Sequence, residues 1–359
     1  MSDLHQNPEY PTELPFRKIL DHGFVALVDV MGVDASIVQS ARVSYGKGTK
    51  TVRSDKALIS YLMRHAHTTP FEMVEFKFLM RIPLFIARQV IRHRTASVNE
   101  YSARYSEVPD RFFVPSLGAI SAQDTVNRQG RSDLLRELAA ELADPVLTAP
   151  DGSTITRAEI EVPANQIRFA QKLGFEDALP SEAYVMLAER LLDKFPERKA
   201  KHEAIQAEFR ENNRRCYALY REQLAGGVAR EIARCVLPLT MYTEWYWKID
   251  LHNLFHFLRL RMDAHAQYEV RALAEAMATF VKPHVPFAWE GFYNDRVQGT
   301  FLSLQEREVL RPRDGDAARA VLEGLYERGY RRRRLKEVCR KLSMDEALVD
   351  ELWPPKSKS

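Results

Sequence analysis

The stretch VEFKFLMRI, residues 74–82, decides the core of the fold. Its apolar side chains occupy alternate positions, which predicts a β-strand with one face buried. The side chains expected on the other face are mostly charged: Glu75, Lys77 and Arg81. Pro83 follows at once, and because proline suits the first turn of a helix, the largely apolar residues 84–91 are predicted to be helical. This predicted helix ends in a polar cluster: Gln89, Arg92, His93 and Arg94.

Further strands and helices are predicted on both sides of this stretch. Two segments have the composition of strands, namely residues 24–29 and 240–249. Helical spacing of apolar residues is present at 34–44, 54–66, 181–224 (interrupted at Pro196), 251–262 and 265–281. Asp250 is a suitable N-cap for the helix at 251–262. Residues 134–180 lack sustained periodicity and are interpreted as an insertion, and the tail has short amphipathic patterns at 317–326, 334–342 and 345–352.

Composition and charge exclude several classes of protein. The 359 residues have an ordinary globular composition, which excludes collagen-like, low-complexity and disulfide-scaffold chains. Lys and Arg number 52 and Asp and Glu number 49, a net charge of +3. Residues 301–359 hold 14 basic and 11 acidic residues, so 14 − 11 = +3 and the rest of the chain is neutral. This excess is too weak to favour a nucleic-acid-binding protein.

Cysteine usage and hydropathy bear on the cellular compartment. Three widely separated cysteines form neither a CxxC pair nor a zinc ligand set, which is typical of a reducing cytoplasm. No run of 18 apolar residues is present, so no membrane span is expected, and the N-terminal residues do not have the pattern of a signal peptide.

The densest polar cluster is RHRTASVNEYSARYS, residues 92–106. Three arginines and one histidine lie within 13 residues there, among hydroxyl and amide side chains. Guanidinium groups bind phosphate through paired hydrogen bonds, so the cluster predicts an anion site. The alternative is a solvated charged loop.

Two histidine-containing segments allow more than one interpretation. His252 and His256 share a helix face and, with His265, could hold a metal, but packed histidines that form hydrogen bonds are favoured. Arg234 and Arg261 follow apolar runs and could bind an anion or form structural salt bridges. His67, close after His65 at a predicted helix end, could cap the helix, stack against a ring or act in catalysis.

Standard nucleotide-binding and hydrolase motifs do not occur in the sequence. It has no GxGxxG, GxxxxGK[ST] or GxSxG pattern, and residues 46–49 (GKGT) only superficially resemble a phosphate loop. No cysteine has an obviously activating context.

Several ordered blocks resemble flavin-dependent thymidylate synthases. The family signature, Arg-His-Arg followed by Ser after seven residues, corresponds to Arg92-His93-Arg94 and Ser102. Further similar blocks are His67–Glu72, Pro83–Gln89, Glu231–Arg234, Leu237–Leu239, Lys248–Arg261 and His265–Gln267. The resemblance covers about residues 20–300, more weakly at 134–180.

This resemblance implies a fold, a reaction and an assembly. The implied fold is α+β, with a mostly antiparallel sheet flanked by long helices. The implied enzyme is a methyltransferase that converts dUMP to dTMP, with methylenetetrahydrofolate as carbon donor and NADPH as reductant of FAD, which passes a hydride into the product. The implied assembly is a homotetramer whose FAD sites are built from several subunits. A cytoplasmic location is expected from the cysteine usage, and binding to membrane or nucleic acid is not expected from the hydropathy and charge.

The resemblance also implies roles for individual residues. The implied dUMP site comprises Gln89, Arg92, Glu100, Tyr101, Ser102, Ala103, Arg104, Arg234 and Arg261. The implied FAD contacts are Thr69, Arg92, His93, Arg94, Glu100, Asp250, His252 and His256. His67 would lie near flavin and folate, no metal is implied, and Arg261 would be catalytic. Many family members have Asn where this chain has Asp250 and His256.

The chemistry is consistent with a catalytic arginine. The C5 atom of uracil becomes nucleophilic when the ring loses its N3 proton, and a fixed cation stabilises the resulting anion. Catalysis through the cofactor requires no activated cysteine. Ser102 could be a nucleophile, but no base is evident beside it, so substrate binding is favoured.

The predicted organisation is a catalytic domain at 1–300, with an insertion at 134–180 and a basic helical extension at 301–359.

Two other functions remain open. One is a nucleotide-binding module without turnover, which intact Arg92, Arg104, Arg234 and Arg261 disfavour. The other is a nucleic-acid-binding protein that uses Tyr330 and Arg331–Arg334, although such a run is usually a solvated face.

Overall fold

The computed structural model describes residues 10–43, 52–124, 130–175, 177–300, 303, 315–342 and 344–353. The glycine-containing segment at 46–49 therefore lies outside the described residues. The chain divides into two compact units, Met1–Val297 and Gln298–Ser359.

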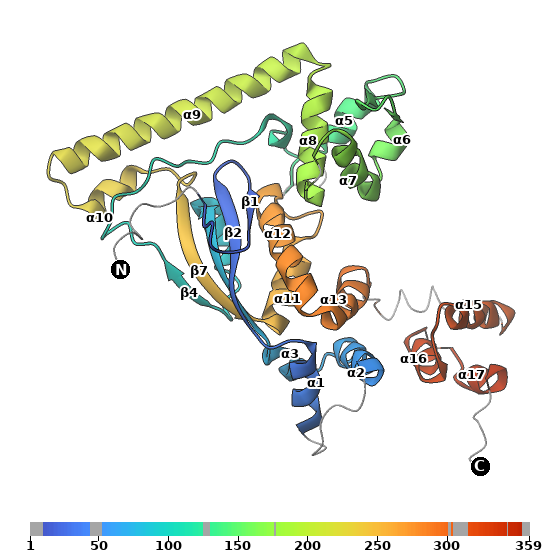
Figure 1. Ribbon diagram of the computed structural model, residues 1–359. Coiled ribbons are helices and arrows are strands. Elements are labelled where there is room, and N and C mark those ends of the chain that lie inside the picture. Colours follow the sequence, from blue (N-terminus) through green and yellow to red (C-terminus); the bar gives the residue numbers. More distant parts are fainter. Residues whose placement is uncertain are drawn as a thin grey trace. The chain divides into compact units, whose positions relative to one another are not determined.

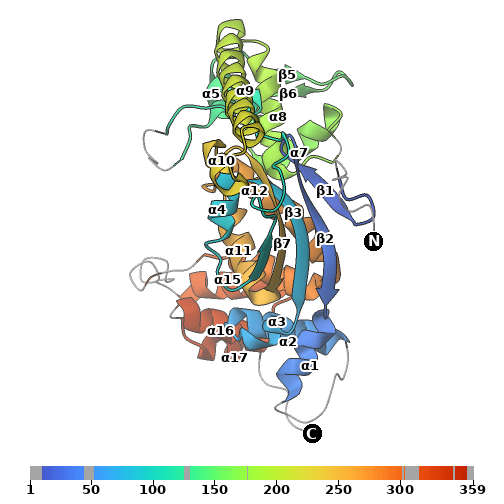
Figure 2. The ribbon, with the colours of Figure 1, turned by 90° about the vertical axis from the view of Figure 1, so that its left-hand side faces the viewer.

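A five-stranded antiparallel sheet is the centre of the first unit. Its strands are β1 (Phe16–Ile19), β2 (Gly23–Met31), β3 (Glu75–Pro83), β4 (Ser97–Glu100) and β7 (Tyr242–Asp250). They lie in the order β1-β2-β3-β7-β4, and every pairing is antiparallel (Figures 1 and 2). The predicted strands at 24–29, 74–82 and 240–249 are thereby confirmed.

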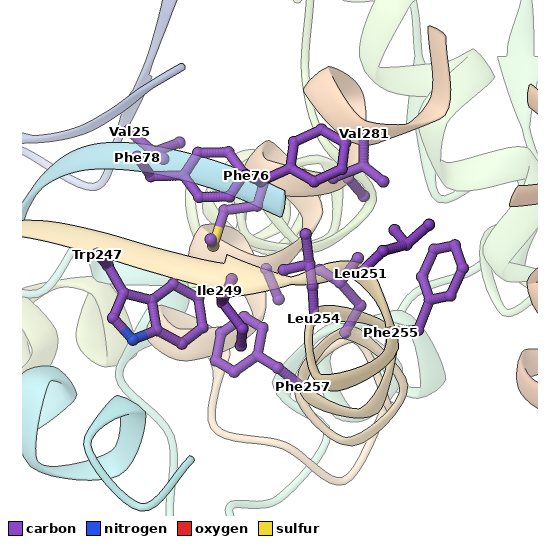
Figure 3. Close-up of a cluster of buried hydrophobic side chains, with 14 of the residues drawn as sticks. Val25, Phe76, Phe78, Trp247, Ile249, Leu251, Leu254, Phe255, Phe257 and Val281 are labelled. Carbon is purple, nitrogen blue, oxygen red and sulfur yellow. The ribbon is translucent and has the colours of Figure 1, made fainter. Parts of the chain in front are cut away.

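One face of this sheet forms the main hydrophobic core. Phe76 and Phe78 of β3 lie opposite Ile249 and Trp247 of β7, and all four side chains are buried. They pack with apolar residues of α11 (Leu251–Arg261) and α12 (Tyr268–His284), as Figure 3 shows. Burial of apolar surface at about 25 cal/mol per Å² makes this layer the main source of stability.

Arg81 departs from the simple alternation expected for β3. It points away from the apolar face as predicted, yet it is only 2% exposed. Its Nε donates a hydrogen bond to Glu244 Oε1 at 2.8 Å, and its guanidinium lies 4.8 Å from the ring centroid of Phe24. A carboxylate and an aromatic ring thus replace the solvent that the sequence pattern assigns to this position.

Helices pack around the sheet and carry five of the candidate residues, namely Thr69, Gln89, His252, His256 and Arg261. They are α1 (Asp34–Arg42), α2 (Val52–Arg64), α3 (Thr69–Glu72), α4 (Leu84–Val90), α11, α12, α13 (Pro286–Phe292) and the π-helical turn η4 (Tyr293–Val297). The N-cap prediction is confirmed, because Asp250 Oδ1 accepts from the backbone N–H of Asn253 at 3.0 Å. The predicted helix start at His265 is wrong: the Asp263 carboxylate accepts from the His265 backbone N–H and holds a turn before α12.

Residues 134–180 form a small packed layer of their own. They contain α5 (Leu134–Ala140), β5 (Leu147–Thr148), β6 (Thr154–Ile155), α6 (Arg157–Ile160) and α7 (Pro163–Lys172). These elements pack with α8 (Pro180–Leu192) around a second buried cluster that includes Leu138, Phe169 and Leu191. Elements of two to ten residues are too short to show sustained periodicity, which is why the sequence pattern misses them.

Longer and shorter helical segments complete the first unit. The prediction of a long helical region broken at Pro196 is confirmed by α8 and by α9 (Pro196–Ala225), the long helix in Figure 1. After α9, Gly227 adopts a φ of +81°, a conformation that glycine favours. The remaining turns are η2 (Leu117–Ala119), α10 (Arg230–Ala233) and η3 (Arg234–Val236).

The second unit has three helices and its own buried cluster. The helices α15 (Gly315–Glu327), α16 (Arg332–Leu342) and α17 (Ala347–Leu352) correspond to the three predicted amphipathic segments. Leu322, Leu335, Cys339 and Val349 are buried between them. Of the helices in the described ranges, none combines the length and apolar character that crossing a membrane requires.

Candidate functional site

A cavity of about 250 Å³ opens beside α11. Its wall is contributed by the end of α2, the segment leading into α3, α3 itself, one face of α11, α13 and η4. The lining residues are Leu62, Met63, Ala66, His67, Thr68, Phe71, His252, Phe255, His256, Arg259, Phe292 and Arg296. Aromatic and aliphatic groups with a few polar side chains are the usual composition of a small-molecule site.

Helical geometry explains why α11 presents three polar residues to the cavity. His252, His256 and Arg259 are spaced i, i+4 and i+7, so they share one helix face. The opposite face carries Leu254 and Leu258, which are fully buried. Asp250 was also expected to contact FAD. Its carboxylate instead bonds within its own segment, where Oδ1 accepts from Asn253 N at 3.0 Å and Oδ2 accepts from Asn253 Nδ2 at 2.7 Å.

His67 reaches the cavity through a tight turn at the end of α2. Ala66 adopts a φ of +55°, which costs a non-glycine residue roughly 1–2 kcal/mol. The His67 ring lies 6.0 Å from the ring of Tyr61 and 6.5 Å from that of His65. Ring packing is therefore the observed role of this segment, and Thr69, the first residue of α3, is exposed beside the cavity-lining Thr68.

Arg261, at the end of α11, is held by two neutral acceptors. Its Nε donates to His93 Nε2 at 3.2 Å, and its Nη2 donates to the backbone carbonyl of Gln89 at 3.3 Å. The Gln89 side chain in turn donates from Nε2 to Gln267 Oε1 at 2.6 Å. No carboxylate within the described residues pairs with Arg261, so the structural salt bridge that the sequence left open is not formed there.

The electrostatics of this cluster keep His93 uncharged at neutral pH. Burial, together with the charge of Arg261 and of His256, lowers the pKa of His93 to about 4. Burial and the nearby charges of Arg259, His252 and Arg261 also lower the pKa of His256. Burial lowers the pKa of Arg261 as well. The His93 and His256 rings lie 5.8 Å apart and connect Arg261 to the cavity.

The two arginines that flank His93 are exposed. Within the described part of the chain, the guanidinium groups of Arg92 and Arg94 make no hydrogen bond or ion pair. The next segment is β4, an edge strand in which all four residues are exposed. Unpaired arginines beside an open edge are available to an anionic ligand, in line with the anion-site prediction.

A second group of candidates begins with Glu100, the last residue of β4, and continues into the segment after it. Glu100 Oε1 accepts from Thr243 Oγ1 at 2.7 Å, and Tyr101 Oη donates to the Glu107 carbonyl at 2.8 Å. Burial raises the pKa of Tyr101. Arg104 forms an ion pair with Glu231 of α10 at 3.0 Å, and both side chains are more than half exposed.

The rest of this second group adjoins α10. Ala103 is buried in one apolar cluster with Ala233, and the exposed Arg234 comes next in the chain. Ser102 Oγ accepts only a long hydrogen bond, 3.4 Å from the Arg104 N–H. Among the described residues no histidine or carboxylate is bonded to Ser102, so no general base for a nucleophilic role is present there.

The candidates thus fall into two groups. The Arg261 group surrounds the cavity and its margin and comprises His67, Thr69, Gln89, His93, Asp250, His252, His256 and Arg261. The Ser102 group comprises Glu100, Tyr101, Ser102, Ala103, Arg104 and Arg234, and Arg92 and Arg94 lie on the segment between the two groups. Across the described residues, no hydrogen bond, ion pair or ring contact joins the side chains of the Arg261 group to those of the Ser102 group.

Some residues of the site were not predicted. Arg259 lines the cavity and could have been found from its helical spacing to His252. Arg296 also lines the cavity and donates to the Met63 carbonyl at 2.6 Å, but nothing in its local sequence indicates this. Gln267 is bonded to Gln89 across 178 positions of sequence.

Metal ligation was the alternative for the histidines of α11. In the residues that the structure describes, no group of three or more His, Cys, Asp or Glu side chains is placed to hold a metal ion. His265 instead lies next to the Asp263 carboxylate, with Nδ1 2.8 Å from Oδ1. The observed contacts of His252 and His256 are with the cavity and with His93.

Comparison with known proteins gives concordant results. Residues 26–287 match the family described as thymidylate synthase complementing protein. A protein of Rickettsia conorii named flavin-dependent thymidylate synthase is 43% identical over 306 residues, which is 82% of this chain and 83% of the relative. A protein of Thermus thermophilus with the same name is 44% identical over 303 residues, 84% and 86% of the two chains.

A solved structure resembles this chain as well. It is the UMP/dUMP methylase PolB of Streptomyces cacaoi bound to 5-Br dUMP, with a TM-score of 0.54 and 26% sequence identity. The match covers 78% of this chain and 99% of the PolB chain. The α+β fold with a mostly antiparallel sheet, expected from the sequence, is confirmed by this likeness and by the sheet itself.

Proposed function

The chain belongs to the flavin-dependent thymidylate synthases, and we propose how its residues bring about the methylation of dUMP to dTMP. Methylenetetrahydrofolate is the carbon donor and NADPH reduces the bound FAD. The observation that carries this proposal is the Arg261 guanidinium, held by His93 and Gln89 at the margin of a histidine-lined cavity. The alternative of a nucleotide-binding module without turnover does not account for this fixed cation.

Arg261 supplies the electrostatic part of the reaction. A guanidinium has five N–H donors, and two of those of Arg261 are engaged with protein acceptors. The remaining donors are available to the uracil carbonyls and to N3 after its proton leaves. Since the cation is fixed before the substrate binds, no reorganisation is needed as negative charge develops on the ring.

The cavity has the properties expected of part of an FAD site. Its apolar wall contains Phe71, Phe255 and Phe292, and its polar side chains include His252 and His256. At about 250 Å³ it is smaller than the roughly 300–1,000 Å³ of complete ligand pockets, so it accommodates only a portion of FAD. Bound FAD supplies the hydride chemistry.

We assign the remaining FAD contacts to residues around this cavity. His252 and His256 line the cavity, Thr69 follows the cavity-lining Thr68 in the chain, and His93 adjoins the cavity through its ring contact with His256. Arg92 and Arg94 are cations suited to the FAD phosphates. Glu100 and Asp250 are already engaged with Thr243 and Asn253, so they contact FAD only through the oxygen lone pairs that remain. His67, which lines the cavity, is assigned a contact with flavin or folate.

The dUMP phosphate is assigned to exposed arginines. Arg92, Arg104 and Arg234 are cations at the surface, and the Arg104–Glu231 pair is exposed and contributes at most about 1 kcal/mol. A phosphate dianion can therefore displace Glu231 from Arg104. Gln89, Glu100, Tyr101, Ser102 and Ala103 contribute to the same substrate site.

Assembly as a homotetramer is part of the proposal. The Arg261 and Ser102 groups have no side-chain contact within the described chain, and Arg92 and Arg94 are exposed between them. Sites completed by neighbouring subunits account for this arrangement. The three cysteines are free thiols, which suits the proposed cytoplasmic location.

The visible absorption spectrum tests the proposed function most directly. The purified protein, supplied with FAD, is expected to show bound flavin and to form dTMP from dUMP, methylenetetrahydrofolate and NADPH. A protein that binds no FAD contradicts the flavoenzyme assignment. A protein that binds FAD and dUMP but forms no dTMP supports the alternative of a module without turnover.

A further inference from the structure

We propose that His93 is a positioning residue for Arg261, whose Nε–H it accepts so that the outer guanidinium nitrogens face the uracil of dUMP. This inference rests on the proposed function, because it names how a second residue acts through the catalytic arginine. His93 is thereby assigned a task beyond contact with FAD.

Two hydrogen bonds along one edge of the Arg261 guanidinium fix its plane. The Nε–H points to His93 Nε2 at 3.2 Å, and one Nη2–H points to the Gln89 carbonyl at 3.3 Å. Because a guanidinium is planar, two hydrogen bonds on one edge determine its orientation. Both N–H groups of Nη1 and one of Nη2 are left for the substrate.

The His93 ring is itself held by its surroundings. Its backbone N–H donates to the Val90 carbonyl at 3.0 Å, which ties the residue to the end of α4. Its ring meets the fully buried Phe257 in an edge contact with centroids 4.9 Å apart. A ring packed in this way holds its Nε2 lone pair in a fixed direction.

The charge state agrees with the role of an acceptor. Nε2 can accept only in the neutral ring whose proton is on Nδ1. The charged and titratable groups that act on His93 are Arg261 and His256, both on α11, and both disfavour its protonation, as burial does. Protonation would place a second cation against Arg261 and remove the acceptor.

The second ring nitrogen of His93, Nδ1, can link contact with FAD to the orientation of Arg261. In the described chain, His93 Nδ1 has no protein partner, so its N–H is available to a ligand. If FAD accepts from Nδ1–H, the same imidazole contacts the cofactor on one side and Arg261 on the other. Flavin binding and the orientation of Arg261 are then coupled through one ring.

Two substitutions at His93 separate acceptor loss from loss of the ring. His93→Gln can place an amide oxygen near the position of Nε2, whereas His93→Leu removes the acceptor. Since a misplacement of about 1 Å can cost roughly 100-fold, His93→Leu is expected to lower kcat by about that factor. His93→Gln, with one imperfect hydrogen bond, is expected to stay within about tenfold of the unchanged enzyme.

A matched control is available at His284. This residue is also half-buried and packs edge-on against an aromatic ring, that of Phe76, but its Nδ1 bonds to Phe280 of its own helix. His284→Leu is expected to leave kcat within about twofold, in the range of substitutions away from functional groups. An equal loss of kcat in His93→Leu and His284→Leu would overturn the proposal.

The double variant tests whether His93 acts through Arg261. If it does, His93→Leu lowers kcat in the unchanged enzyme but has no further effect on kcat in the Arg261→Ala background, while its effect on FAD affinity persists. Bound 5-fluoro-dUMP, whose ring ionises near neutral pH, adds a spectroscopic signature. The pH at which the bound ring ionises should rise in His93→Leu and not in His284→Leu. Independent, additive effects of His93→Leu and Arg261→Ala on kcat would overturn the proposal.

A measurement without flavin keeps this inference separate from the proposed function. Histidine C2–H exchange followed by mass spectrometry reports the titration of each histidine in the full-length protein. His93 should titrate well below its ordinary pKa of about 6.5, and its pKa should rise in Arg261→Ala, since a repelling cation is removed. A His93 that titrates near 6.5 would overturn the arrangement even in a chain that forms dTMP.

Discussion

The Arg261 group and the Ser102 group are held in place by different means. Arg261 is fixed by an imidazole and a backbone carbonyl, beside a cavity whose wall is continuous with the main core. In the Ser102 group, Arg104 has only an exposed ion pair and Arg234 is exposed without a partner in the described chain. The Arg261 guanidinium is therefore fixed by the fold of a single chain, whereas the guanidinium groups of Arg104 and Arg234 are left exposed at the surface.

This difference predicts unequal consequences of mutation. Removal of a fixed charge takes away stabilisation that exists before the substrate binds, and this lowers kcat. An exposed cation becomes ordered only when the substrate binds to it. Its removal therefore weakens substrate binding and raises KM. Substitutions in the two groups therefore distinguish a fixed cation from an exposed one.

Arg261→Ala is expected to have the largest effect. Loss of one preorganised charge donor typically lowers kcat by roughly 10²–10³, so NADPH-dependent dTMP formation should fall by about that factor. The FAD spectrum should persist, since the wall of the cavity is unchanged. Turnover close to that of the unchanged enzyme would remove Arg261 from the catalytic role.

Arg104→Ala is expected to act mainly on KM for dUMP. A charge-assisted hydrogen bond is worth about 1.5–3 kcal/mol, so KM should rise by roughly 10- to 100-fold with kcat little changed. Glu231→Ala is the matched control, because it removes the partner of Arg104 and leaves the cation free. KM should then stay the same or fall, and a raised KM in Glu231→Ala would argue that the ion pair itself shapes the site.

Asp250→Ala distinguishes a helix cap from a cofactor contact. The Asp250 carboxylate caps α11, so its loss should lower the free energy of unfolding by about 1 kcal/mol. FAD affinity should change only slightly, because both oxygens are engaged by Asn253. Denaturant unfolding and flavin titration measure the two effects, and the opposite pattern would make Asp250 primarily a cofactor ligand.

The depressed pKa of His93 predicts a pH dependence of stability. The folded state holds this pKa at about 4, below the unfolded value of about 6.5, so the unfolded state binds the proton more readily. The neutral His93 ring contributes to the free energy of unfolding above pH 6.5, and this contribution is lost as the pH falls from 6.5 towards 4. The melting temperature of His93→Gln should therefore fall less over this interval than that of the unchanged protein.

Removal of residues 298–359 is expected to have the smallest effect on catalysis. The three helices of this second unit bury their own apolar cluster, and the first unit has separate cores. Arg331 and Arg334, part of the run considered for nucleic-acid binding, contact Tyr326 and Glu337 inside the second unit. kcat should stay within about twofold, and a large loss would give the second unit a part in the site.

Much of the fold was accessible from local patterns, and some of it was not. Alternation at residues 74–82 and the cap at Asp250 are short-range signals, and the structure contains both. The burial of Arg81 depends on Glu244, which lies 163 positions away in sequence, and no local pattern reports such a contact. The short elements of residues 134–180 were missed because their stability comes from packing against α8.

Spacing along the chain is enough to recognise the signature Arg92–Arg94 with Ser102 and the helix face that His252 and His256 share. Which of these side chains meet depends on how the chain packs. The bond between Arg261 and His93 joins residues 168 positions apart, and Arg296 reaches Met63 across 233 positions. Such contacts, and the pKa of His93 that follows from them, depend on burial and on distances in space, which only packing of the complete chain establishes.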